Sequence, residues 1–104
     1  HDTLIDLNTQ LTADEMQQIS FQIKAKHDKT VLLLTSDMNE KPLISLMISD
    51  DLVEEMQWNA SQFIRDLSRL IKGGGGGQAF FANAGGSDVK GLTLLKEKAK
   101  SLLN

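Results

Sequence analysis

The chain has 104 residues and a formal net charge of −3, with 40% hydrophobic and 24% charged residues. This length fits one domain, and the composition is globular rather than disordered or collagen-like. Cysteine and tyrosine are absent, which excludes disulfides, thiolate zinc ligands and catalysis by either residue type. The longest apolar run, Val31–Leu34, is far shorter than a membrane span.

The charge is distributed unevenly along the chain. Residues 1–57 hold eleven acidic and four basic residues, a balance of −7, whereas residues 58–104 hold three acidic and seven basic residues, a balance of +4. A basic second half permits one face of the molecule to bind an anion, despite the negative total. The seven bases of that half are Arg65, Arg69, Lys72, Lys90, Lys96, Lys98 and Lys100.

The first elements are a short strand and a helix. Residues 1–10 are expected to form a leading strand or linker, with residues 3–7 β-compatible. A helix is predicted over 13–28, because Thr12 and Glu15 form a capping-box pattern at its start. Its apolar face at helical spacing comprises Met16, Ile19, Ile23 and His27, with His27 expected to be partly buried.

Two strands and a short helix follow. Residues 31–36 and 43–49 are predicted to pair antiparallel, because they lie close in sequence and Pro42 marks the edge of the second strand. A short helix is expected to run from about Ser49 through Met56. Its acidic residues permit a metal site, but acids at a helix start, favoured by the dipole, are the simpler interpretation. These acids are Asp50, Asp51, Glu54 and Glu55.

A helix over 60–72 is predicted next, with Asn59 as its cap and Trp58 packing against Phe63. Gly73 stands where a left-handed cap residue is expected. The last helix is predicted over 89–103, capped by Asp88. Its apolar stripe comprises Val89, Leu92, Leu95, Ala99 and Leu102.

Five consecutive glycines, residues 73–77, separate these helices. The amides of such a run can converge on an anion, with some glycines at positive φ. We favour an ordered loop over a flexible linker, because the partly strand-like stretch 78–84 contains the apolar residues 79–82. The preceding helix presents its negative end, so a phosphate would be held by loop N–H groups with Lys72 and Arg69. The P-loop pattern is absent, and no catalytic constellation is found.

Residues 59–62 and 71–86 resemble the C-terminal domain of alanyl-tRNA synthetase. That family ends in a helix, a glycine run, a short apolar segment closing on Ala84-Gly85-Gly86, and a last helix. The same domain type accompanies DHH-type phosphoesterases, which have histidine after the glycines. Here Gln78 takes that place, and the seven residues between Gly77 and Gly85 resemble the synthetase form, although Ala79 replaces its common proline.

The resemblance implies a non-catalytic appendage that contacts the outer corner of tRNA and helps to couple aminoacylation with editing. The chain lacks an initiator methionine and is expected to be a fragment of a cytoplasmic alanine–tRNA ligase. That parent would use ATP, Mg²⁺ and an editing-domain zinc ion, none of them in this fragment. The expected partners are alanine-acceptor tRNA and the parent's other domains, with a second copy of the chain as a further candidate, but no membrane.

We therefore predict one small α/β domain over residues 1–104, with a mixed or antiparallel sheet, helices packed on it and a glycine-rich loop between the last helices. The alternatives are the substrate-binding or nucleic-acid-binding domain of a DHH-type phosphoesterase, or an oligomerisation module. Phe80 and Phe81 could stack on bases, with at least one expected in the core. The candidate nucleic-acid-binding residues are Arg69, Lys72, Gly73, Gly74, Gly75, Gly76, Gly77, Gln78 and Lys90.

Overall fold

The computed structural model describes residues 1–103, except for the side chains of residues 5–9. The strands are β1 (Asp2–Thr9), β2 (Thr30–Ser36), β3 (Leu43–Ile48), β4 (Gly74–Gly77) and β5 (Phe81–Gly85). The helices are α1 (Ala13–Lys26), α2 (Asp50–Met56), α3 (Ala60–Ser68) and α4 (Leu92–Leu103). Three 3-10 turns join them, namely η1 (Met38–Glu40), η2 (Arg69–Ile71) and η3 (Val89–Gly91).

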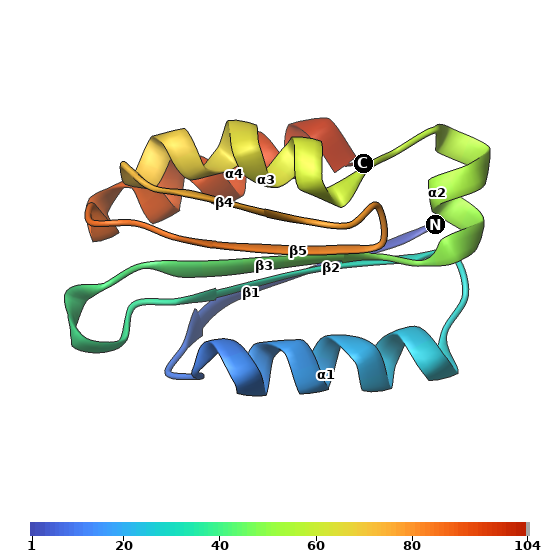
Figure 1. Cartoon of the computed structure of the whole chain (residues 1–104), viewed down its shortest axis with the longest axis horizontal. Coiled ribbons are helices and arrows are strands. Elements are labelled where there is room, and N and C mark those ends of the chain that lie inside the picture. Colours follow the sequence, from blue (N-terminus) through green and yellow to red (C-terminus); the bar gives the residue numbers. More distant parts are fainter. Residues whose placement is uncertain (104) are drawn as a thin grey trace.

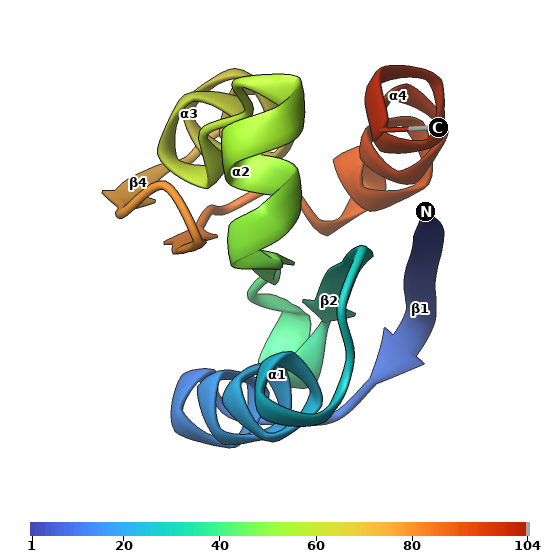
Figure 2. The ribbon, with the colours of Figure 1, turned by 90° about the vertical axis from the view of Figure 1, so that its right-hand side faces the viewer.

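The strands form one mixed sheet in the order β1-β2-β3-β5-β4. Strand β1 pairs parallel with β2, and the remaining neighbours pair antiparallel. Figure 1 shows α1 below the sheet and α3 and α4 above it, and Figure 2 shows the same layers end-on. The start of β1 lies beside the end of α4, where the His1 ring nitrogen Nε2 lies 2.7 Å from the carbonyl oxygen of Leu103. The predicted α/β domain is confirmed.

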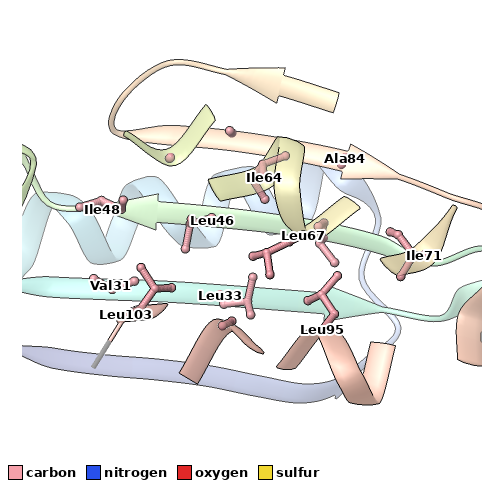
Figure 3. Packing of buried hydrophobic residues seen from close by; sticks show 14 of the residues in the cluster. Val31, Leu33, Leu46, Ile48, Ile64, Leu67, Ile71, Ala84, Leu95 and Leu103 are labelled. Atoms are coloured by element: carbon pink, nitrogen blue, oxygen red, sulfur yellow. The ribbon is translucent and has the colours of Figure 1, made fainter. Parts of the chain in front are cut away.

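The core has two parts because the central strands are covered on both faces. In β2, Val31 and Leu33 face α3 and α4, whereas Leu32 and Leu34 face α1. This two-sided burial explains why β2 is continuously apolar instead of alternating with polar residues. Figure 3 shows the larger part, in which the labelled side chains from strands and helices meet. They include Leu46, Ile64, Leu67, Ile71, Leu95 and Leu103.

The predicted caps are present. The Thr12 hydroxyl accepts from the Glu15 amide, and the Glu15 carboxylate accepts from the Thr12 amide at 2.9 Å, which completes the capping box. The Asn59 side chain accepts from the Ser61 amide at the start of α3. The Trp58 and Phe63 rings pack edge-to-face with centroids 6.0 Å apart. Local signals therefore placed both helix starts correctly.

Two predicted burials are wrong. His27 is exposed, because α1 ends at Lys26 and the extended backbone of His27 leaves the helical face. Leu102 is 40% exposed, and Leu103, which lies four residues after Ala99, is the buried residue at the end of α4. Among the described residues, no helix is both long enough and apolar enough to span a membrane.

Candidate nucleic-acid interface

The glycine run is ordered, as predicted, but it forms a strand instead of a loop. Strand β4 pairs antiparallel with β5, with Gly75 opposite Ala84. The hairpin closes through a hydrogen bond of 2.8 Å from the Gln78 amide to the Phe81 carbonyl. An extended strand directs its N–H groups alternately to opposite edges, so they do not converge on one anion as the loop hypothesis required.

Glycine is required here by close approach of two backbones. A Cβ atom on Gly73, Gly75 or Gly77 would lie 1.9, 2.1 or 2.4 Å from a main-chain oxygen of residues 85, 83 and 81, respectively. A Cβ atom on Gly74 would meet nothing within 4 Å. No described glycine has positive φ, so that prediction is wrong. Side chains are therefore excluded at residues 73, 75 and 77, because the backbone of residues 81–85 occupies the space that they would need.

The left-handed residue at the end of the third helix is Lys72, with φ of 53°, and not Gly73. The helix predicted over 60–72 is α for its first part and continues as η2. The Lys72 amide donates to the Arg69 carbonyl, and the Gly73 amide reaches back to the Ser68 carbonyl. This compact ending turns the chain directly into β4.

A tight junction between η2 and η3 brings three predicted basic residues to one end of the molecule. The amides of Ser87 and Asp88 both donate to the Ile71 carbonyl at 2.9 Å. Gly91 allows η3 to approach η2 closely, because a Cβ atom at residue 91 would lie 1.8 Å from the Leu70 carbonyl oxygen. The Asp88 side chain caps η3 by accepting from the Lys90 amide, as predicted.

Arg69, Lys72 and Lys90 are exposed at this end, which we call the basic end. Gln78 lies at the other end of β4, where the Ala79 carbonyl accepts from the Ala60 amide. At about 3.3 Å per residue, the extended chain between Lys72 and Gln78 spans roughly 20 Å. The candidate residues therefore extend from the basic end along β4 instead of surrounding one pocket.

That edge offers main-chain groups as well as charge. Within the described part of the chain, strand β4 has only β5 as a neighbour in the sheet, and its glycines are exposed apart from half-buried Gly76. An edge strand presents unpaired N–H and C=O groups, which here have no side chains to cover them. The arrangement suits an extended polar partner that follows the strand from the basic end.

The first two acidic residues of α2 have structural roles. The Asp51 carboxylate accepts from the Ser49 hydroxyl at 2.6 Å and from the amides of Lys29 and Leu52. These hydrogen bonds, the one from Ser49 foremost, lower the pKa of Asp51. Asp50 pairs with Lys24 at 3.0 Å. Within the described part of the chain, no group of three or more potential ligands is placed to hold a metal ion.

Of the two aromatic residues considered for base stacking, one is in the core, as expected. Phe81 is buried in the sheet core, whereas Phe80 is half-buried, with the Lys24 ammonium 5.0 Å from its ring centroid. Phe21 of α1 joins them, with its ring centroid 5.1 Å from that of Phe81. Nothing in the spacing of Phe21 marks it in the sequence, because it lies off the apolar face formed by Met16 and Ile23.

Comparisons with known proteins agree with this architecture. The family model described as the DHHA1 domain matches residues 3–104. The alanine–tRNA ligase of Cytophaga hutchinsonii is 45% identical over 92 residues, which cover 88% of this chain and 10% of that protein. The alanine–tRNA ligase of Christiangramia forsetii is 39% identical over 93 residues, covering 89% and 11%. The chain thus spans about a tenth of the length of these curated relatives.

A solved structure shares the fold. The C-Ala domain from Aquifex aeolicus alanyl-tRNA synthetase superposes with a TM-score of 0.86 at 22% sequence identity. The match covers 97% of this chain and 89% of the other. The mixed sheet and the helices on both its faces are therefore found in an independently determined structure.

Proposed function

Because the chain belongs to the DHHA1 domain family, in the form resembling that of alanyl-tRNA synthetases, we propose that it binds tRNA as part of a longer alanine–tRNA ligase. The 45% identity to one such ligase along 88% of the chain carries this proposal. The same similarity, with Gln78 in place of histidine after the glycines, favours the synthetase interpretation over a phosphoesterase.

The proposed RNA-binding surface is the β4 edge together with the basic end. Arg69, Lys72 and Lys90 supply positive charge for phosphates, and the bare main chain of β4 permits close approach of a sugar–phosphate backbone. Contacts of this kind read RNA shape instead of base sequence. The net charge of −3 predicts that the isolated chain binds weakly.

The proposal extends to the whole protein. This chain contacts the outer corner of tRNA and helps the aminoacylation and editing centres of the parent to use one tRNA. The parent uses ATP and Mg²⁺, carries its zinc ion in another domain, and acts in the cytoplasm. The partners of the chain within the parent are the other domains, and pairing with a second copy is a further element of the proposal.

The experiment is a titration of the chain with alanine-acceptor tRNA and two other tRNAs at several salt concentrations. Arg69→Ala and Lys72→Ala should each weaken binding to all three tRNAs about equally and reduce the salt slope by about one. Lys26→Ala is the matched control, since Lys26 is an exposed lysine on the opposite face of the sheet. Equal effects of all three variants, or no binding at low salt, would contradict the proposal.

A further inference from the structure

A cavity of about 250 Å³ opens on the α1 side of the sheet, between the first turn of α1 and the strands β3, β5 and β4. It exists because α1 packs mainly on β3 and β2 and covers little of β5 and β4 beyond them. Its walls are mostly apolar or small. The lining residues include Met16, Leu43, Ser45, Gly75, Asn83 and Ala84.

Two of the lining residues are polar. Ser45 is 1% exposed, and its hydroxyl has no hydrogen-bond partner, which is unusual and costly for a buried polar group. Asn83 lies directly opposite Ser45 in the β3–β5 register, so both side chains point to the same face of the sheet. A serine and an asparagine therefore lie side by side among the lining residues of the cavity, and none of the described lining residues is charged.

We propose that this cavity binds a single unstacked nucleobase. Its volume is below the range of about 300–1,000 Å³ that suits drug-sized ligands, which favours one ring system. Unstacked bases are held between apolar side chains and read along their polar edges, and an asparagine amide matches adenine best. The Ser45 hydroxyl, which has under 1 Å² of exposed surface, would gain the partner that it lacks once the base opens the cavity further.

The neutral lining argues against a phosphate or carboxylate ligand, because no basic side chain is present to balance the charge. A purely aliphatic ligand would leave Ser45 unpaired. Gly74 and Gly75 line the cavity and also belong to the β4 edge, so a base entering it would come from RNA that follows this edge. The inference that the base comes from RNA therefore rests on the proposed function, whereas the inference that the cavity binds a base does not.

The test uses the 104-residue chain and amide chemical shifts in nuclear magnetic resonance. Adenosine, guanosine, cytidine and uridine are added separately, with ribose 5-phosphate as the probe for sugar and phosphate alone. We expect adenosine to shift the amides of Ser45, Gly75 and Asn83 most strongly and ribose 5-phosphate to leave them unchanged. Shifts with ribose 5-phosphate alone, or none with any nucleoside, would overturn the proposal.

Two serine variants separate recognition from stability. Ser45→Ala should weaken adenosine binding by about three- to tenfold, the effect of one hydrogen bond, while keeping or raising the melting temperature. Ser61→Ala is the matched control, because Ser61 also has a buried hydroxyl without a partner but lies in α3, on the other face. It should have the same effect on melting and none on binding. Unchanged binding by Ser45→Ala would overturn the proposal.

A tRNA titration of Ser45→Leu, which fills the cavity, distinguishes this inference from the proposed function. Weaker tRNA binding, with the fold intact by amide shifts, supports a base from RNA. Nucleoside binding by the native chain without tRNA binding would support a base-binding cavity and contradict the proposed function. Binding of tRNA without nucleoside binding, and unaffected by Ser45→Ala, retains the proposed function and rejects the pocket.

Discussion

Lys72 combines an unfavourable backbone conformation with a charge at the proposed RNA-binding end. Its φ of 53° lies in the left-handed region, which costs a residue with a Cβ atom about 1–2 kcal/mol. Glycine adopts this region without that cost, yet glycine begins one residue later. A lysine is consistent with a position where charge matters more than local stability.

Lys72→Gly should therefore raise the free energy of unfolding by about 1 kcal/mol and weaken tRNA binding in the same protein. Urea denaturation measures the first effect and a tRNA titration the second. Lys29→Gly is the control, because Lys29 is an exposed lysine with φ of 50° in the α1–β2 connection. That variant should gain similar stability with unchanged binding, and a loss of tRNA affinity would count against the assigned surface.

At the scale of elements, the β4–β5 hairpin depends on alternate glycines. Gly75→Ala would place a Cβ atom 2.1 Å from the Asn83 carbonyl oxygen, so β5 must move. We expect a loss of about 1–3 kcal/mol in the free energy of unfolding, by analogy with overpacked cores, together with weaker tRNA binding. Urea denaturation and a tRNA titration measure these effects.

Gly74→Ala tests the same strand at a position with open space. Because alanine restricts the unfolded chain, this variant should be neutral or gain up to about 1 kcal/mol of stability. Equal destabilisation by the two alanines would mean that β4 needs glycine for its conformation and not for its contact with β5.

Helix starts and central strands were predictable because their signals are local. The capping box at Thr12 and the apolar run from Val31 determine their own structure. The conformation of the glycine run was not predictable, since its cause is the backbone of β5, which is distant from Gly73 in sequence. The Ser45–Asn83 pair is likewise created by strand register, and a single serine between apolar residues gives no sign of its partner.

The start of α2 contains a pH-dependent contact. The lowered pKa of Asp51 means that its charged form stabilises the fold above about pH 4, the ordinary value for an aspartate, and that this stabilisation disappears as the pH falls further. Asp51→Asn should lower the melting temperature at pH 7 and reduce its decline between about pH 5 and pH 2. Melting curves across this range test the prediction, and an unchanged decline would exclude Asp51 as a contributor.

At the scale of the molecule, the acidic helix α2 and the basic residues Lys72 and Lys90 lie at opposite ends. Figure 1 shows α2 at the right-hand end and the connections that contain Lys72 and Lys90 at the left-hand end. The longest extent of the domain is 34 Å. Electrostatic screening acts over about 8 Å at physiological salt and about 30 Å at 0.01 M salt. RNA bound at the basic end would therefore sense the acids of α2 only at low salt.

The double substitution Glu54→Gln/Glu55→Gln removes two exposed negative charges from α2. If RNA binds at the basic end, tRNA affinity should rise measurably at 0.01 M salt and stay unchanged at 0.15 M salt, because the field of α2 is then screened. Arg69→Ala should weaken binding at both salt concentrations, because the proposed function places Arg69 in direct contact with the RNA. A clear gain in affinity for the double variant at 0.15 M salt would place the RNA beside α2 and reject the β4 edge as its site.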